Sequence, residues 1–231
     1  MNKKHKLVIV GVGETAELAH DYFSLDSEYE VVAFAAEKSY LNKYKFLQVD
    51  GLPVVSIEDM KEIYPENIYS VFVAMSYTRL NHDRCRLYKK IKSLGYHLAS
   101  YISSKAFIGS NVSIGENCFI LENNVLQRNV VIGDNVFLWS GNHIGHRTII
   151  DKHVFLSSHV AVSGYCRIGK YCFLGINSCL GDNVSIADNT FIGGGVALMH
   201  DSRVGEVYRI NPANAERLSS KQIWRYSDEL V

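Results

Sequence analysis

One hydrophobic pattern dominates the second half of the chain. Every sixth residue is aliphatic over 17 consecutive positions. These residues are Ile102, Ile108, Ile114, Ile120, Leu126, Ile132, Leu138, Ile144, Ile150, Leu156, Val162, Ile168, Leu174, Leu180, Ile186, Ile192 and Leu198. A helix repeats every 3.6 residues and cannot keep a period of six on one face, whereas the two-residue period of a strand divides six evenly. Each six-residue unit is therefore expected to be a short strand followed by a bend.

A second series stands two residues before each aliphatic residue, and most of its members are small or β-branched, such as Val112, Cys118 and Val154. The residue after the aliphatic one is often glycine, as at Gly109 and Gly133. We expect these glycines to permit the bends. Unbroken repetition at a short, fixed period is typical of a parallel β-helix.

The first hundred residues have a different pattern, in which short apolar runs alternate with helical periodicity. We expect strands at 5–10, 30–34, 54–55 and 70–74, with helices ending near Phe23 and spanning 56–63 and 81–94. Residues 97–102 then lead into the repeat. Strands that alternate with helices imply a small parallel sheet covered by helices on both faces.

A glycine turn follows the first expected strand, in the order Gly11, Gly13, Glu14 and Ala16. Such a turn presents the free amides of a helix N-terminus to an anion, but it also occurs where a helix merely packs tightly on a sheet. A dinucleotide site would place an acidic residue at the tip of the second strand. Ala35 and Ala36 stand there instead, which favours a phosphate-bearing ligand smaller than a dinucleotide.

Composition narrows the remaining possibilities. The 231 residues carry 24 Lys and Arg against 24 Asp and Glu, so no excess charge points to nucleic acid or to a membrane surface. Apolar runs are too short for a membrane span, and we expect a cytoplasmic protein. Three of the five cysteines fall in the small series, where cysteine acts as a small hydrophobe.

The repeat resembles the hexapeptide repeat of the left-handed β-helix acyltransferases, in which three units make one triangular coil. Seventeen units would then give about six coils. A Rossmann-like domain followed by such a prism is similar to one branch of these enzymes, the sugar acyltransferases that act on nucleotide-linked amino sugars or on sialic acids. The expected organisation is a Rossmann-like nucleotide-sugar-binding domain at 1–101, a left-handed parallel β-helix at 102–200 and a short capping tail at 201–231.

The resemblance implies an N-acetyltransferase that moves an acetyl group from acetyl-CoA to a dTDP- or UDP-linked amino sugar, for surface glycan synthesis. It also implies a homotrimer whose active sites lie between subunits, with acetyl-CoA as co-substrate, no permanently bound cofactor and no metal. Three alternatives stay open: a sugar O-acetyltransferase of the sialic-acid type, a non-enzymatic scaffold and a zinc-dependent β-helix resembling carbonic anhydrase. The histidine spacings do not match those of that zinc site.

Candidate catalytic residues lie in a coil rich in histidine. His146 follows Ile144 by two positions, so it should lie on a bend and point outward, and His143 should also face outward. An imidazole has an ordinary pKa near 6.5 and can accept the proton that a sugar amine loses. By resemblance, His146 is the base and the backbone amide of Gly164, one coil later, stabilises the oxyanion.

The remaining candidates also follow from the resemblance or from position. Acceptor-binding candidates are Gly11, Gly13, Glu14, Tyr77, Asn81, Arg84 and His143. Coenzyme-binding candidates are Phe155, Ser163, Gly164, Gly175 and Pro212. The alternative for Tyr77, Asn81 and Arg84 is a solvated helix entrance. Where this family commonly has an acidic residue after the histidine, this chain has Arg147.

Overall fold

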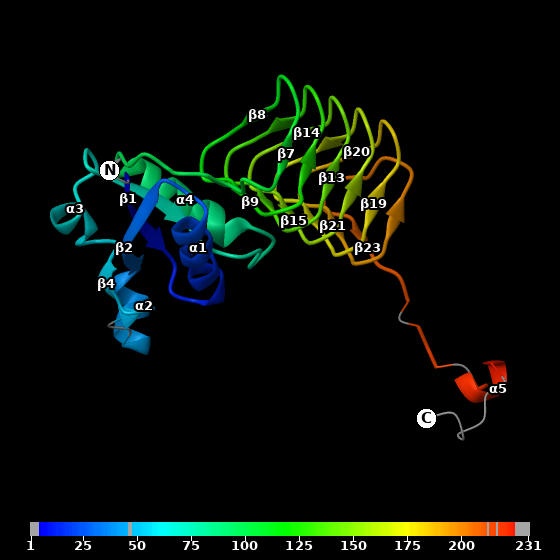
Figure 1. Cartoon of the computed structure of the whole chain (residues 1–231), viewed down its shortest axis with the longest axis horizontal. Coiled ribbons are helices and arrows are strands. Elements are labelled where there is room, and N and C mark those ends of the chain that lie inside the picture. The colour runs from blue at the N-terminus through cyan, green and yellow to red at the C-terminus, as the bar shows by residue number, and fades with distance from the viewer. Residues whose placement is uncertain (1–4, 46–47, 212, 216, 225–231) are drawn as a thin grey trace.

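The computed structural model describes residues 5–45, 48–211, 213–215 and 217–224. These residues form a front domain and a long prism, and the front domain lies toward the end at which the prism begins (Figure 1). The front domain has a five-stranded sheet in the order β3-β4-β2-β1-β5. Its strands are β1 His5–Val10, β2 Tyr29–Ala36, β3 Gln48–Val49, β4 Leu52–Ser56 and β5 Tyr69–Val73. Its helices are α1 Glu14–Leu25, α2 Lys38–Tyr44, α3 Met60–Ile63 and α4 His82–Ser93.

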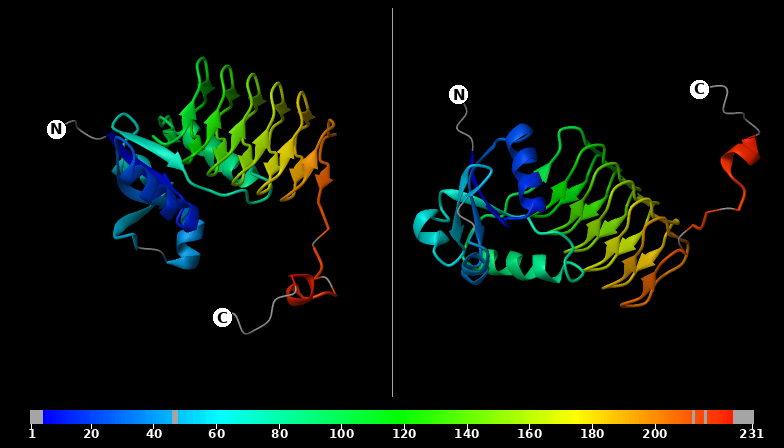
Figure 2. Two further views of the ribbon diagram at one scale, coloured as in Figure 1. Left: turned by 45° about the vertical axis from the view of Figure 1, so that its right-hand side comes forward. Right: turned by 90° about the horizontal axis from the view of Figure 1, so that it is seen from below.

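Alternation along β1 explains why both faces of this sheet are covered. Leu7 and Ile9 pack with Phe23 of α1, whereas Val8 and Val10 pack with Ile91 of α4 on the opposite face. Figure 2 shows α1 and α4 on opposite sides of the sheet. All strand pairs are parallel except the β3–β4 pair. The predicted front-domain sheet is thereby confirmed.

Two helix predictions differ from the structure. The helix expected to begin at Ser56 begins only at Met60, because the Ser56 hydroxyl accepts a hydrogen bond from the Asp59 amide and closes a turn instead. The helix α2 at Lys38–Tyr44 was not predicted, because it buries none of its residues and so carries no apolar period.

The prism consists of two-residue strands, each of which pairs in register with the strand three units along the chain, as Val125, His143 and Ala161 do. Its strands are β6 Tyr101–Ile102, β7 Phe107–Ile108, β8 Ser113–Ile114, β9 Phe119–Ile120, β10 Val125–Leu126, β11 Val131–Ile132, β12 Phe137–Leu138, β13 His143–Ile144, β14 Ile149–Ile150, β15 Phe155–Leu156, β16 Ala161–Val162, β17 Arg167–Ile168, β18 Phe173–Leu174, β19 Cys179–Leu180, β20 Ser185–Ile186, β21 Phe191–Ile192, β22 Ala197–Leu198 and β23 Val207–Tyr208. The second residue of most strands fills the prism core, together with Cys118, Cys166 and Cys172 of the small series.

Three flat sheets make the sides of the prism. We call the sheet from β6 to β23 the docking face, the sheet from β7 to β22 the open face, and the sheet from β8 to β20 the side face. The chain continues past residue 200, because β23 pairs with β21 and adds a seventh strand to the docking face.

The bends are formed mainly by asparagine rather than by glycine. A residue with positive φ recurs every sixth position, for example Asn117 at 54°, Asn123 at 59° and Asn129 at 61°. Asparagine tolerates this left-handed conformation because its short polar side chain bonds locally. The glycines after the aliphatic residues serve close packing instead, since a Cβ on Gly109 would stand 2.9 Å from the backbone of the next coil.

A ladder of aromatic side chains joins the two domains. The first residue of each docking-face strand points outward, and Phe119, Phe137, Phe155 and Phe173 are buried there in the same cluster as Phe72 of the front domain. The front domain therefore covers the docking face and leaves the edge between the other two faces uncovered.

The tail does not cap the prism as expected. Its helix, α5 at Ser220–Trp224, lies away from the last coil in both views (Figures 1 and 2). The side chains at 213–215, 217–220 and 222–223 are exposed, so these residues bury no apolar surface against the prism in a single chain.

Candidate active site

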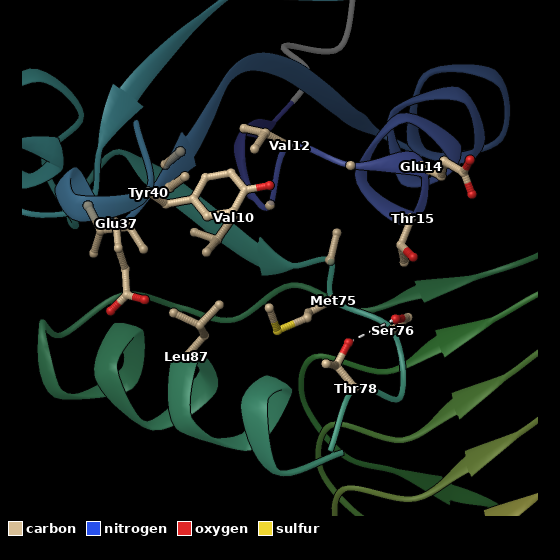
Figure 3. A pocket seen from close by; sticks show the side chains of 16 residues that line it. Val10, Val12, Glu14, Thr15, Glu37, Tyr40, Met75, Ser76, Thr78 and Leu87 are labelled. Atoms are coloured by element: carbon tan, nitrogen blue, oxygen red, sulfur yellow. Dashed lines mark hydrogen bonds between the residues drawn. The ribbon is translucent and has the colours of Figure 1, made fainter. Parts of the chain in front are cut away.

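The front domain has a cavity of about 340 Å³ at the carboxyl ends of β1, β2 and β5 (Figure 3). Parallel α/β sheets bind ligands at this edge, because the strand ends open into a crevice between the helices on the two faces. The lining residues are Val10, Gly11, Val12, Gly13, Glu14, Thr15, Ala35, Ala36, Glu37, Tyr40, Ile57, Ala74, Met75, Ser76, Thr78 and Leu87.

The two glycines of the turn have different physical roles. Gly11 has a φ of 137°, and a Cβ there would stand 2.4 Å from the Ala74 carbonyl oxygen, so the fold itself requires glycine. Gly13 is extended, caps α1 and has nothing within 4 Å of a built Cβ. Gly13 lines the cavity, and a side chain there would meet open space rather than protein atoms.

The N-terminus of α1 makes this cavity suitable for an anion. Its first amides carry the partial positive charge of a helix end. The Glu14 carboxylate points away from Tyr40 and Met75 (Figure 3). The hydroxyl-bearing residues Thr15, Ser76 and Thr78 line the cavity. Hydroxyls and helix amides can donate to phosphate or sugar oxygens without adding charge.

Glu37, which follows the second strand, is held by the front domain. Both of its oxygens accept hydrogen bonds from Arg86 at 2.7 Å, and Lys90 lies 3.3 Å away. The bonds from Arg86 lower the pKa of the Glu37 carboxyl. The carboxylate is thus fixed at the cavity rim in the ionised form.

Two of the three predicted contacts near the start of α4, Asn81 just before the helix and Arg84 within it, are buried between the domains. Arg84 is fully buried and donates to four backbone carbonyls, those of Met75, Ser76, Asn135 and Val154. Its guanidinium lies 4.3 Å from the Phe137 ring centroid, and burial lowers its pKa to about 9. Asn81 is also fully buried and donates to the Cys172 carbonyl. Neither side chain can touch a ligand, so the prediction of ligand contact is wrong for both.

Tyr77, the third of these predicted contacts, is only partly buried. Its ring packs against Phe155 at 5.1 Å and Phe173 at 4.7 Å, and about half of its side chain is exposed. It does not line the cavity. Tyr77 therefore closes the rim of the docking face.

The second half of the site lies on the edge between the open and side faces, which we call the histidine edge. His146 follows β13 and is exposed there. A Cβ built on Gly164 would stand 2.7 Å from His146 Cε1 and 3.0 Å from its Nε2. The imidazole therefore lies directly against the backbone of Gly164, one coil further along, as the register predicts.

Gln127 and Asp182 flank this pair. Gln127 Oε1 accepts the His146 backbone amide at 2.9 Å and lies 3.2 Å from His146 Nδ1. The Gly164 amide donates to Asp182 Oδ1 at 3.0 Å. Asp182 is exposed, so its carboxylate can turn into solvent and release the amide. Neither residue was predicted. One coil of the repeat separates position 128 from 146 and position 182 from 164, so the repeat alone could have indicated that Gln127 lies near His146 and Asp182 near Gly164.

Arg147 does not pair with the histidine. Its guanidinium lies 5.8 Å from the ring centroid of Tyr165, and Tyr165 in turn meets the edge of the His146 ring at 5.0 Å. The orienting contact to His146 thus comes from the preceding coil and not from the next residue.

The coenzyme candidates are dispersed over the prism. Ser163 and Gly164 lie on the histidine edge, but Gly175 follows β18 and lies on the edge between the docking and open faces. Phe155 is buried beneath Tyr77 and Arg84, so its predicted contact with the coenzyme is wrong. His143 is exposed on the open face between Val125 and Ala161. Pro212 lies outside the described residues.

Two further observations concern metal and membrane. Among the described residues, no group of three or more His, Cys, Asp or Glu side chains is arranged to hold a metal ion. No helix in the part of the chain that the structure describes is both long and apolar enough to cross a membrane.

Comparison with known proteins bears on this arrangement. The family profile described as the GMPPB C-terminal domain matches residues 92–212, which is more than half of the chain. The chain belongs to the GMPPB C-terminal domain family. A search among curated proteins gave no match.

Several solved structures are similar to this member of the family over nearly its whole length. The acetyltransferase domain of PglB from Neisseria gonorrhoeae FA1090, in complex with acetyl coenzyme A, has a TM-score of 0.78 at 21% identity and covers 88% of this chain and 95% of its own. A mutant of perosamine N-acetyltransferase from Caulobacter crescentus, in complex with CoA and GDP-perosamine, has a TM-score of 0.74 at 23% identity and covers 85% of this chain and 89% of its own. WeeI from Acinetobacter baumannii AYE has a TM-score of 0.53 at 16% identity, with coverage of 84% and 94%.

These similarities extend across both domains. They confirm the predicted fold, a Rossmann-like α/β domain followed by a left-handed parallel β-helix. The sequence of the prism, and not its fold alone, falls within the GMPPB C-terminal domain family.

Proposed function

We propose that this protein is a cytoplasmic N-acetyltransferase that transfers the acetyl group of acetyl-CoA to the amino group of a nucleotide-linked amino sugar, for surface glycan synthesis. Two similar structures support this assignment, since one holds acetyl coenzyme A and the other holds CoA with GDP-perosamine. The front-domain cavity at the N-terminus of α1 suits the diphosphate of the acceptor.

The chemistry needs a base and an oxyanion donor at one carbonyl. The sugar amine attacks the thioester carbon, forms the C–N bond and loses a proton to His146. The negative charge that develops on the carbonyl oxygen is stabilised by the Gly164 amide. Collapse of the tetrahedral intermediate breaks the C–S bond, and His146 returns its proton to the sulfur, so that coenzyme A leaves as the thiol.

One observation carries this proposal: the His146 ring lies against the Gly164 backbone, with Cε1, Nε2 and Nδ1 at 2.7, 3.0 and 3.1 Å from a Cβ built on Gly164. A thioester bound beside this pair would have the base and the amide donor within one site. The Asp182 carboxylate, which holds that amide in the structure, must turn aside when the thioester binds.

We further propose that the protein is a homotrimer with active sites between subunits. Within one chain the front domain covers the docking face, and His146 lies on the edge opposite that face. A sugar amine held in the cavity of one chain is thus directed to the base of a neighbour. The outward row of the open face is Phe107, Val125, His143, Ala161, Cys179 and Ala197. This row has no Asp, Glu, Lys or Arg, so it can pack against a second copy without burying a charge.

The test compares two exposed histidines of the same coil. His146→Ala should lower kcat by about 10²–10⁴-fold with nearly unchanged acetyl-CoA affinity, because it removes the base. His143→Ala should cost less than tenfold, since His143 meets no polar partner on the strands beside it. Thiol release is measured near pH 7, where much of the amine is still protonated, with GDP-, UDP- and dTDP-linked 3-amino and 4-amino sugars as acceptors.

The control acceptors are the matching sugars with a hydroxyl in place of the amine. Turnover of these alone would replace the N-acetyltransferase by an O-acetyltransferase. A larger loss at His143 than at His146 would overturn the assignment of the base.

A further inference from the structure

Gln127 occupies an unusual position on the histidine edge. It directly follows the inward Leu126 of the open face. The residues at the same register are Gly109, Gly145, Ser163, Gly181 and Met199. Gln127 is the only one of these with a carboxamide. It is half-buried and lies one coil before His146.

The contacts of Gln127 determine the orientation of its amide. The His146 backbone N–H can only donate, so the Gln127 atom 2.9 Å away must be the oxygen. The same oxygen lies 3.2 Å from His146 Nδ1 and can only accept. Nδ1 therefore carries the hydrogen, and the neutral ring has its lone pair on Nε2.

That lone pair is the one available to the amine. Nε2 and Nδ1 lie 3.0 and 3.1 Å from a Cβ built on Gly164, so both nitrogens border the space beside Gly164. Nδ1 is bonded to Gln127, which leaves Nε2 as the nitrogen free to accept a proton. The opposite tautomer would place a hydrogen on Nε2 and leave Nδ1 without a donor toward Gln127, and a ring in that tautomer cannot accept the proton of the incoming amine at Nε2.

We propose that Gln127 is a positioning residue that holds His146 in the Nδ1–H tautomer and so directs Nε2 toward the amine. This inference rests on the proposed acetyl transfer. The Gln127 carboxamide, in the preceding coil, accepts from Nδ1 and so orients the His146 ring as an acidic residue at position 147 would, but without adding a charge.

The charged and titratable groups around His146 are few. Arg147 is adjacent in sequence and lies over Tyr165, and Tyr165 meets the imidazole edge-on. Asp182 holds the Gly164 amide, and Arg128 follows Gln127 on an exposed turn. None of the four is hydrogen-bonded to the imidazole, so the side-chain contact that orients the ring is the bond from Nδ1 to Gln127, whose oxygen also accepts the His146 backbone amide.

Two substitutions of Gln127 separate orientation from charge. Gln127→Ala removes the acceptor and should lower kcat by about 10- to 100-fold with unchanged KM for acetyl-CoA, because the ring can then adopt either tautomer. Gln127→Glu keeps the acceptor but adds a negative charge, which favours the protonated ring. The acid limb of the pH–rate profile should then move up by roughly one pH unit, and the rate should recover to near wild type above pH 8. Gln48→Ala, at an exposed glutamine of β3, is the matched control and should change nothing.

A second measurement does not depend on activity. Nitrogen NMR of the imidazoles in the ligand-free full-length protein reports which ring nitrogen carries hydrogen, and His146→Ala assigns the resonance. We expect the Nδ1–H form in wild type and in Gln127→Glu, and a mixture in Gln127→Ala. An Nε2–H form in wild type, or an unchanged tautomer in Gln127→Ala, would overturn the inference. Failure of the proposed function would appear differently, because His146→Ala would then keep full activity.

Discussion

His153 makes the junction of the two domains sensitive to acid. The side chain is 4% exposed, and it stacks on Tyr171 and meets the edge of Tyr88 of α4. The Val73 amide donates to Asn117 Oδ1, Asn117 Nδ2 donates to Asn135 Oδ1, and Asn135 Nδ2 therefore donates to His153 Nδ1 at 2.9 Å. This chain of donors leaves Nδ1 as an acceptor, so the ring is neutral.

The pKa gives the magnitude of the effect. Burial, with a further contribution from the charge of Arg84, lowers the pKa of His153 to about 4 from an ordinary value of 6.5. Below pH 6.5 the unfolded chain binds a proton that the folded protein does not, so stability falls as the pH falls and levels off below about 4. Each pH unit of this shift corresponds to about 1.4 kcal/mol, and the whole window to about 3 kcal/mol.

The substitution His153→Asn tests this value. Asparagine fits the backbone, because His153 has a φ of 65° and Asn117 and Asn135 occupy the same register at 54° and 58°. Urea unfolding at pH 7.5 and at pH 4.0 gives the loss of stability between the two for each protein. We expect the wild type to lose about 3 kcal/mol more than the variant over this range.

The control is His159→Asn, one unit further along the prism. His159 has a φ of 58° and is exposed, so this variant should lose stability with pH in parallel with the wild type. Parallel curves for His153→Asn as well would refute the reasoning, because they would mean that His153 binds its proton equally in the folded and unfolded chains.

Two further predictions concern the acceptor cavity and the assembly. Gly13→Val should weaken acceptor binding by tenfold or more and leave acetyl-CoA binding and thermal stability unchanged, because Gly13 lines the cavity and a side chain there clashes with no protein atom. Gly11→Val should instead lower stability, because its Cβ would stand 2.4 Å from the Ala74 carbonyl oxygen. Calorimetry and thermal melts distinguish the two, and equal loss of both ligands in Gly13→Val would mean that the turn only supports the fold. Sedimentation should give three times the chain mass of 26.0 kDa, and co-expressed His146→Ala and Gly13→Val chains should recover part of the activity that each lacks alone. A mass near one chain at micromolar concentration, or no recovery in mixed trimers, would contradict the shared site.

The prism was predictable from sequence because each of its coils obeys the same local condition. An inward aliphatic residue, a small residue and a bend recur at fixed spacing, and no distant contact is needed to place them. The front domain was less predictable at Ser56, where the same local residues can either cap a helix or close a turn. The Ser56 hydroxyl accepts the Asp59 amide, and α3 begins only at Met60. The tail helix at Ser220–Trp224 lies away from the last coil (Figures 1 and 2).

The candidate site divides in the same way. The proximity of His146 and Gly164 was predictable because a separation of one full coil fixes it, whatever the side chains do. The contact of Gln127 with His146 was missed because it depends on a rotamer that brings Oε1 to the His146 backbone, and sequence spacing carries no information on rotamers. Arg84 was misassigned for a related reason. A positively charged residue near a helix start usually meets solvent. Only the docking of the prism adds the carbonyls of Asn135 and Val154 to those of Met75 and Ser76 and buries the guanidinium.

The docking face itself was encoded in the sequence by a signal of longer period than six. Phe119, Phe137, Phe155, Phe173 and Phe191 recur once per coil, at every third unit of the repeat, each as the outward residue of its strand. An outward position should favour polar residues unless something covers it, and the rows of the other two faces include His143, Arg167 and Ser185. Five phenylalanines on one face therefore require a cover, and the front domain is the part of the chain adjacent to the first coil. Phe155 belongs to that ladder by register, which is why a coenzyme role inferred from its motif position alone fails.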